Sequence, residues 1–78
     1  MDARARLIDW IRVHGVDAET VDAATPFLAE GHLNSIQLTD FILFVEEVSG
    51  RPLLLDHLKP DNFANVDAVC AAFFGEDT

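Results

Sequence analysis

The sequence predicts an all-α domain, built as a small four-helix bundle with three main helices and one short helix. Apolar residues recur every three or four positions in three segments of the chain. Capping and helix-breaking residues stand at the ends of these segments. The sequence lacks the alternation of apolar and polar residues that is typical of strands. Apolar residues make up 50% of the 78 residues, which is enough for one core. Residues 1–78 are therefore expected to form a single domain.

The first helix is expected from Asp2 to His14, and Gly15 follows it in the position of a C-cap. Charged residues should occupy its outer side, and its apolar side should face the core. The residues of this apolar stripe are Leu7, Trp10, Ile11 and His14.

A long connection, residues 16–33, follows the first helix. Helical periodicity fades there, and turn formers such as Thr25-Pro26 appear. Phe27 and Leu28 are expected to enter the core and hold this connection down. Ordered loops of such length are often functional.

The second helix is expected to run from Ser35 to about Ser49. Asn34 is a good N-cap residue, and Gln37 stands three positions later, in the register of a capping box. Gly50 is expected to end the helix in the left-handed conformation.

The last part of the chain is expected to hold a short helical turn and one more helix. Arg51-Pro52 opens a second, shorter connection, and residues 60–64 suit one turn around Phe63, because proline fits a first turn. Asn65 should cap the last helix, which Gly75 should end. The apolar stripe of this helix is Val66, Val69, Cys70 and Phe73, so the Cys70 thiol is expected to be buried and inert.

The second helix has two distinct sides. Its core side is predicted to be Leu38, Phe41, Ile42, Val45 and Val48. The opposite side carries two aliphatic residues seven positions apart among acidic and polar ones. We interpret it as a docking strip, defined as Ile36, Thr39, Asp40, Leu43, Glu46 and Glu47. The alternative is scatter, since single exposed apolar residues are common.

The charge balance restricts the partners. The chain has 14 acidic and 5 basic residues, a net charge of −9. This field repels phosphate backbones and anionic lipids, so binding to nucleic acid or a membrane surface is not expected. Partners should instead carry basic patches. The sequence contains no apolar run long enough to span a bilayer and no recognisable signal peptide, so we expect a cytoplasmic protein.

Ser35 is the candidate functional residue. It is expected at the first turn of the second helix, and its near sequence neighbours include no lysine, with His32 as the nearest histidine. An unassisted hydroxyl is weakly reactive, so Ser35 is a poor nucleophile on its own account. It is better placed to be modified by another enzyme.

Four segments, in order, carry a resemblance to a known family. They are Thr25-Pro26-Phe27-Leu28, then Gly31-His32-Leu33-Asn34-Ser35-Ile36, then the stretch 41–50 with its paired acids before a glycine, and finally residues 58–66. The chain resembles the stand-alone acyl and peptidyl carrier proteins. The resemblance covers most of the chain, and it implies a bundle of the acyl-carrier-protein type.

The resemblance also implies a function. A phosphopantetheinyl transferase would attach 4'-phosphopantetheine, derived from coenzyme A, to Ser35. The arm would hold acyl or aminoacyl cargo as a thioester and present it to partner enzymes. These partners would be an adenylating, acyl-loading or aminoacyl-loading enzyme and downstream transferase or tailoring enzymes. The chain itself would be no enzyme, and it is expected to be a monomer.

One position departs from the family pattern. The residue before the modified serine, usually aspartate in the family, is Asn34 here. Both side chains cap a helix, so the fold should be unaffected, but one negative charge beside the site is lost. Some free-standing peptidyl carriers of natural-product pathways are similar in having Asn-Ser here. The departure favours a specialised acyl or aminoacyl pathway over fatty-acid synthesis.

Other kinds of site are less well supported by the sequence. His14, His32, His57 and Cys70 lack the spacing of metal ligands, so no metal is expected. The main alternative to a carrier is an unmodified helical docking module, in which Ser35 is only a first-turn residue. If cargo touches the domain, the candidate contacts are Phe27, Leu28, Ile36 and Leu58.

Overall fold

The computed structural model describes residues 2–50 and 60–74. Within these residues the chain is all-helical and contains no strand, as the sequence predicts. The elements are α1 (Ala3–His14), α2 (Ser35–Ser49), the 3₁₀-helix η2 (Pro60–Phe63) and α3 (Val66–Phe73). The expected connection at Arg51-Pro52 and the expected stop at Gly75 lie outside the described residues.

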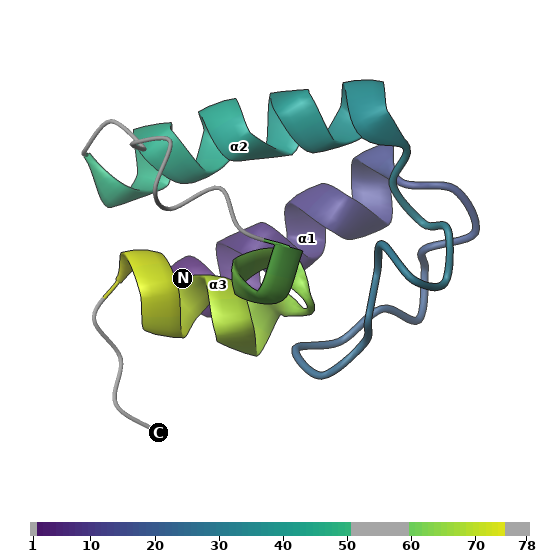
Figure 1. Cartoon of the computed structure of the whole chain (residues 1–78), viewed down its shortest axis with the longest axis horizontal. Coiled ribbons are helices and arrows are strands. Elements are labelled where there is room, and N and C mark those ends of the chain that lie inside the picture. Colours follow the sequence, from purple (N-terminus) through teal and green to yellow (C-terminus); the bar gives the residue numbers. More distant parts are fainter. Residues whose placement is uncertain (1, 51–59, 75–78) are drawn as a thin grey trace.

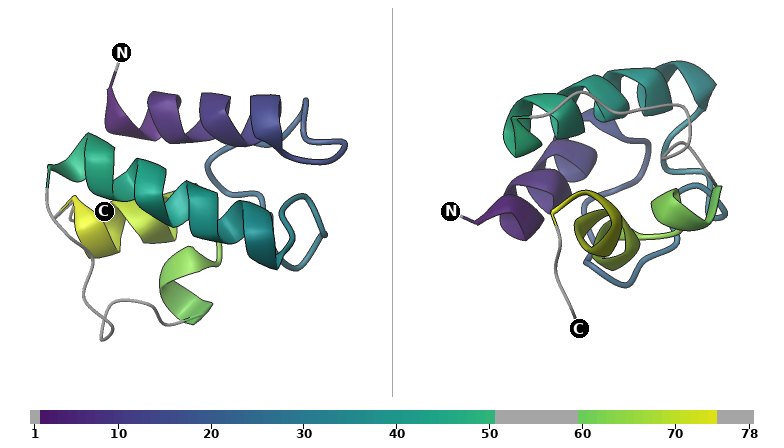
Figure 2. Two further views of the ribbon diagram at one scale, coloured as in Figure 1. Left: turned by 90° about the horizontal axis from the view of Figure 1, so that it is seen from above. Right: turned by 60° about the vertical axis from the view of Figure 1, so that its left-hand side comes forward.

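Helix α1 holds the arrangement together. It packs against both α2 and α3, and η2 packs against α3 (Figure 1). Seen from above, α2 runs across the front of α3, with α1 along one side of α2 and η2 on the other (Figure 2). The long connection, residues 15–34, gathers at the end of the molecule where α1 ends and α2 begins.

The helix starts follow the predicted caps. The Asn65 side chain accepts the N–H of Ala68 at 2.8 Å and caps α3. Asp2 was expected inside the first helix, but α1 begins at Ala3, because the Asp2 side chain accepts the N–H of Ala5 at 2.8 Å and acts as the N-cap.

The helix ends can be compared with the sequence prediction at α2 and α3. Gly50 ends α2 in the left-handed conformation, with φ of 72°, as predicted. Helix α3 ends at Phe73 with Phe74 as its C-cap, directly before the position where the sequence predicts the stop. The Phe74 N–H still bonds to the Cys70 oxygen, while its ψ of 4° has left the helical range.

The core combines one side of every helix with side chains from the long connection. Its fully or almost fully buried apolar residues are Leu7, Ile11, Ala18, Val21, Phe27, Leu33, Phe41, Val45, Phe63, Val66, Val69, Cys70 and Phe73. Phe27 and Leu28 enter the core or pack against it, as predicted. The Cys70 thiol is buried, which also agrees with the sequence.

The core side of α2 largely agrees with the prediction, and one residue of α1 does not. Of the five residues predicted to face the core from α2, Phe41 and Val45 are buried, and Leu38 and Ile42 are half-buried and pack against the core. Val48 is half-buried. His14 was placed on the apolar stripe of the first helix but is exposed. Its ring lies at the end of α1 and stacks on the indole of Trp10, with 4.2 Å between the centroids.

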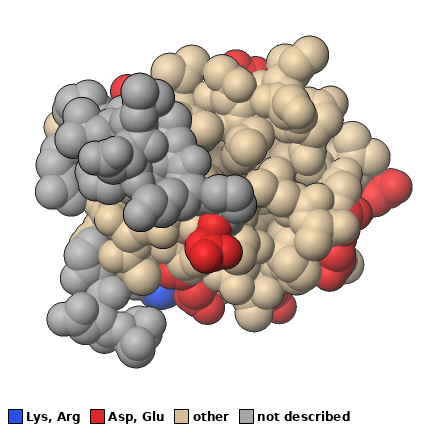
Figure 3. Space-filling model, in the orientation of Figure 1, with Lys and Arg blue, Asp and Glu red and all other residues tan. Residues whose placement is uncertain are grey.

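The described surface is strongly acidic. In the face shown in Figure 3, acidic side chains line the rim on several sides, while basic atoms are sparse. None of the helices in the described part of the chain is long and apolar enough to cross a membrane.

Candidate functional site

Ser35 is the first residue of α2, and its side chain is exposed. Asn34 precedes it as the N-cap, in an extended conformation with φ of −91° and ψ of −177°. The Asn34 side chain accepts the N–H of Gln37 at 2.8 Å, and the Gln37 side chain accepts the N–H of Asn34 at 2.9 Å. The predicted capping box is therefore confirmed.

The capping box leaves two N–H groups at the start of α2. A helix N-terminus has four N–H groups without a partner inside the helix. The capping box bonds those of Asn34 and Gln37. The N–H groups of Ser35 and Ile36 remain, beside the Ser35 hydroxyl and at the positive end of the helix dipole. This position favours an anionic group on Ser35.

A side-chain bridge fixes the start of α2 to the end of α1. The Nε2 of Gln37 donates to the main-chain oxygen of His14 at 2.9 Å. One glutamine thus closes the capping box and joins the two helices. The Thr39 hydroxyl donates to the main-chain oxygen of Ser35 at 3.1 Å. This hydrogen bond does not involve the Ser35 hydroxyl.

The long connection that leads to Ser35 contacts all three α-helices, and these contacts hold it in place. Arg12 of α1 donates from its Nε to the Val21 oxygen at 2.8 Å, and the Asp67 N–H of α3 donates to the Ala23 oxygen at 3.0 Å. The ring of Phe27 meets Phe41 of α2 edge-on, with 5.5 Å between the centroids.

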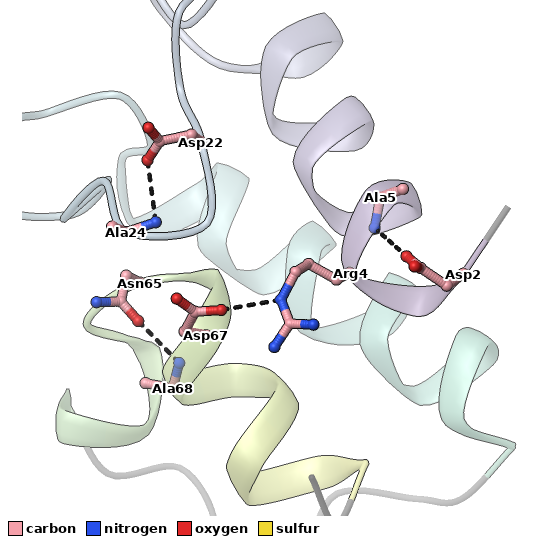
Figure 4. A network of polar contacts seen from close by, with 8 residues as sticks. All are labelled: Asp2, Arg4, Ala5, Asp22, Ala24, Asn65, Asp67 and Ala68. Atoms are coloured by element: carbon pink, nitrogen blue, oxygen red, sulfur yellow. Dashed lines mark hydrogen bonds and ion pairs between the residues drawn. The ribbon is translucent and has the colours of Figure 1, made fainter. Parts of the chain in front are cut away.

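A polar turn within this connection lies next to the ion pair between α1 and α3. The Asp22 carboxylate accepts hydrogen bonds from the Thr25 hydroxyl at 2.9 Å and the Ala24 N–H at 3.0 Å. Together these bonds lower the pKa of Asp22. Nearby, the Arg4 Nε lies 2.9 Å from Asp67 Oδ1 (Figure 4). The connection is therefore held by specific contacts from end to end.

His32 lies three residues before Ser35, in the turn between the core residues Phe27 and Leu33. Its N–H donates to the Phe27 oxygen at 2.8 Å. Its Nδ1 lies 2.9 Å from the Val16 oxygen, and its Nε2 lies 3.3 Å from Glu30 Oε1. The Val16 contact, followed by the Glu30 carboxylate, raises the pKa of His32.

The two aliphatic residues of the docking strip face solvent, as the sequence predicts. Ile36 is 76% exposed and Leu43 is 57% exposed. Thr39, Asp40 and Glu47 are also exposed. Glu46 was expected to belong to the same face but is half-buried, because it lies at the edge of the strip rather than at its centre.

A groove between α1 and α2 was not predicted. It has a volume of about 380 Å³ and is lined by Arg6, Asp9, Trp10, Val13, His14 and Phe44. Val13, one of the lining residues, is 69% exposed. The available signal was this apolar residue near the end of the first helix, outside its apolar stripe.

No protein-family model, curated protein or solved structure matches this chain. The residues around Ser35 are therefore the basis of the proposed function.

The remaining candidate residues do not gather into a second site. Among residues 2–50 and 60–74, no group of three or more His, Cys, Asp or Glu side chains could hold a metal ion. His14 and His32 take part in separate contacts, and His57 lies outside the described residues. Of the candidate cargo contacts, Phe27 is fully buried, Leu28 is half-buried, Ile36 is exposed and Leu58 lies outside the described residues.

Proposed function

We propose that this chain is a carrier protein that bears 4'-phosphopantetheine on Ser35 and serves a specialised acyl or aminoacyl pathway. The observation that carries the proposal is the exposed Ser35 hydroxyl at the first turn of α2, behind a complete capping box. The order of helix, long ordered connection, helix, short helix and helix supports a four-helix bundle of the acyl-carrier-protein type.

The residues around Ser35 suit this modification. The Ser35 oxygen would form an ester bond to the phosphate of coenzyme A that carries pantetheine. The pyrophosphate bond of coenzyme A would break, adenosine 3',5'-bisphosphate would leave, and the hydroxyl proton would pass to a base of the transferase. No histidine of residues 2–50 is bonded to Ser35, and we propose that the activating base is supplied by the transferase.

The start of α2 would then stabilise the product. The N–H groups of Ser35 and Ile36 lie next to the oxygen that would carry the phosphate, and the helix dipole favours a negative charge there. The bridge from Gln37 to His14 keeps this helix end fixed on α1. The attached arm supplies a thiol, which holds acyl or aminoacyl cargo as a thioester.

The docking strip would receive the partner enzymes. Ile36 and Leu43 present apolar area, and Asp40 and Glu47 place negative charge beside it. A basic surface around an apolar socket matches this arrangement. Charge-steered, quickly reversed docking suits a chain that visits one enzyme after another, while the tether keeps the cargo at a high effective concentration. The chain would perform no bond chemistry on the cargo.

Intact-mass measurement tests the proposal. The purified chain is incubated with coenzyme A, magnesium and a phosphopantetheinyl transferase of broad acceptance. We expect the mass to increase by one phosphopantetheine group. The sequence offers a matched pair of variants, because its only serines are Ser35 and Ser49. Ser35→Ala should abolish the increase, and Ser49→Ala, at the other end of α2, should retain it.

Two outcomes would overturn the proposal. An increase that persists in Ser35→Ala would place the group elsewhere, and no increase with several transferases would favour an unmodified docking module built on the same strip. If the modified form is obtained, it can be offered to adenylating enzymes. An amino-acid increment and a fatty-acyl increment then indicate different pathways.

A further inference from the structure

Two segments of the long connection are held together by a reciprocal pair of contacts. The Val16 N–H donates to the His32 main-chain oxygen at 2.8 Å. In the other direction, the His32 Nδ1 lies 2.9 Å from the Val16 main-chain oxygen. This pair, which we term the 16–32 clamp, joins the residue just after α1 to the turn that leads into Asn34 and Ser35.

Both ring nitrogens of His32 face oxygen atoms that can only accept hydrogen bonds. A main-chain oxygen has no proton, so Nδ1 must be the donor to Val16. In neutral imidazole the other nitrogen, Nε2, then presents a lone pair toward Glu30 Oε1, 3.3 Å away. Only the imidazolium form donates from both nitrogens. The geometry is therefore suited to the protonated ring.

The charged groups around His32 have the same effect. Glu30, in its own turn, and Asp17, in the segment after α1, both act on the ring as negative charges. The first turn of α2 carries no acidic residue. Arg12, in the last turn of α1, directs its Nε to the Val21 oxygen. The electrostatic surroundings of His32 thus favour a positive charge.

We propose that protonation of His32 tightens the 16–32 clamp and that its deprotonation loosens it, which changes how firmly Leu33 and Asn34 are held ahead of Ser35. Leu33 is 4% exposed and follows His32 directly, so its burial in the core depends on the same turn. His32 acts here as a positioning residue, since it contacts the backbone that leads to the site rather than the site itself.

The direction of the pH effect follows from the pKa. Because the Val16 contact and the Glu30 carboxylate raise the pKa of His32 in the folded chain, protonation is more favourable in the folded state than in the unfolded one. The extra stabilisation from the imidazolium, which donates from Nε2 to Glu30 and more strongly from Nδ1 to Val16, is complete below the pKa of an unfolded histidine. It is lost as the pH rises through the higher folded-state pKa, and the neutral ring then keeps only the weaker Nδ1 bond to Val16.

NMR on the unmodified chain tests the clamp directly. We expect the ring signals of His32, one of three histidines, to titrate with a pKa above the ordinary histidine value. Over the same pH range, hydrogen exchange of the Val16 amide, corrected for intrinsic exchange rates, should lose protection severalfold. A His32 pKa at or below the ordinary value, or Val16 protection that ignores the titration, would overturn the proposal.

Two variants separate the charge from the fold. His32→Asn keeps a side-chain N–H near the place of Nδ1 without titrating, so protection at Val16 should lose its pH dependence. Glu30→Gln removes the carboxylate and should lower the pKa of His32 while the Val16 contact remains. If His32→Asn unfolds the chain, Glu30→Gln still tests the proposal. An unchanged His32 pKa in Glu30→Gln would contradict the contact between His32 Nε2 and the Glu30 carboxylate.

The consequence for modification rests on the proposed function, but the clamp does not. If Ser35 is modified, the transfer rate should contain a pH-dependent component that disappears in His32→Asn. If Ser35 is never modified, hydrogen exchange and the NMR titration still test the 16–32 clamp independently. The two failures are therefore distinguishable.

Discussion

The Gln37 side-chain amide donates to the main-chain oxygen of His14 across 2.9 Å, and the two residues are 23 positions apart. The same glutamine closes the capping box through its Oε1 atom. The first turn of α2 is therefore oriented by α1 as well as by its own cap. This relationship fixes the direction in which α2 leaves the long connection and so the place of Ser35.

Substitutions at Gln37 separate its two roles. Gln37→Glu keeps the oxygen that accepts the Asn34 N–H but loses the donor to His14. We expect a loss of about 1 kcal/mol in the free energy of unfolding, the usual net contribution of one hydrogen bond. Gln37→Ala loses both contacts and should cost more. Urea unfolding measures both variants. No loss in Gln37→Glu would show that the bridge to His14 contributes nothing, and equal losses in the two variants would show that the capping contact to Asn34 contributes nothing.

Replacement of Asn34 tests the departure from the carrier-protein pattern. Asn34→Asp preserves an acceptor for the Gln37 N–H and should change the stability by less than about 0.5 kcal/mol. Asn34→Ala removes the cap and should cost about 1 kcal/mol. Under the proposed function, Asn34→Asp should also widen the range of transferases that modify Ser35. Each of several transferases is offered an equal mixture of the Asn34 chain and the Asn34→Asp variant, and intact mass measures which of the two is modified faster. Equal rates for the two chains with every transferase would contradict this prediction.

The aromatic contact between the long connection and α2 is expected to be essential for folding. Phe27 and Phe41 are each 0% exposed, with their rings edge-on. Phe27→Ala should cost about 3–5 kcal/mol, a large share of the stability of so small a domain. Leu43→Ala, on the exposed strip, serves as the control and should stay within about 0.5 kcal/mol. Thermal unfolding followed by circular dichroism compares them, and similar midpoints would contradict the assignment of the core.

Gly15 is expected to tolerate no side chain, for steric reasons. A Cβ there would lie 2.7 Å from the Ile11 oxygen, 2.9 Å from the His32 oxygen and 3.0 Å from the Ala18 Cβ. Its φ of −81° suits any residue, so the backbone conformation is not the cause. Gly15→Ala should therefore cost about 1–3 kcal/mol by forcing backbone atoms apart.

Gly31 offers the contrasting control for Gly15. A Cβ at Gly31 would meet nothing within 4 Å, but its φ is 76°. Gly31→Ala should cost about 1 kcal/mol through backbone strain alone. Hydrogen exchange at Val16, which bonds to His32, should change in Gly15→Ala and stay unchanged in Gly31→Ala. The reverse pattern would contradict the steric explanation.

The turn at Asp22 predicts a second pH dependence, in the acid range. The Thr25 hydroxyl and the Ala24 N–H lower the pKa of Asp22. The stabilising effect of the ionised carboxylate is present above the pKa of an unfolded aspartate and is lost as the pH falls through the lower folded-state pKa. Thr25→Val should raise the pKa of Asp22, and Thr25→Ser should leave it low. NMR titration of the carboxylate measures both, and equal values in the two variants would contradict this cause.

Much of the fold follows from short-range patterns in the sequence. The capping box links residues three positions apart, Gly50 supplies the left-handed C-cap that its lack of Cβ permits, and Phe63 anchors the short helix. These features depend on neighbours along the chain. The exposure of Ile36 and Leu43 was likewise readable, because helical geometry alone places them opposite Phe41 and Val45.

The sequence prediction was wrong for other features, because helical periodicity predicts the side of a helix on which a residue lies but not how deeply it is buried. His14 has the spacing of the apolar stripe, yet Ile11 is the last buried residue of α1, so the ring of His14 is exposed and stacks on Trp10. Glu46 has the spacing of the docking strip, yet it lies at the edge and is half-buried. Which positions of a stripe are buried depends on where the neighbouring helices end.

The helices, their caps and the exposed serine at the start of α2 follow from local patterns in the chain, since all of these rest on contacts within one or two helical turns. The contacts of Gln37 with His14 and of His32 with Val16 join residues 23 and 16 positions apart and arise from the folded arrangement. Such contacts depend on the path of the long connection, which is set by the burial of Phe27 and Leu33 in a core shared by all the helices. No local pattern encodes that path.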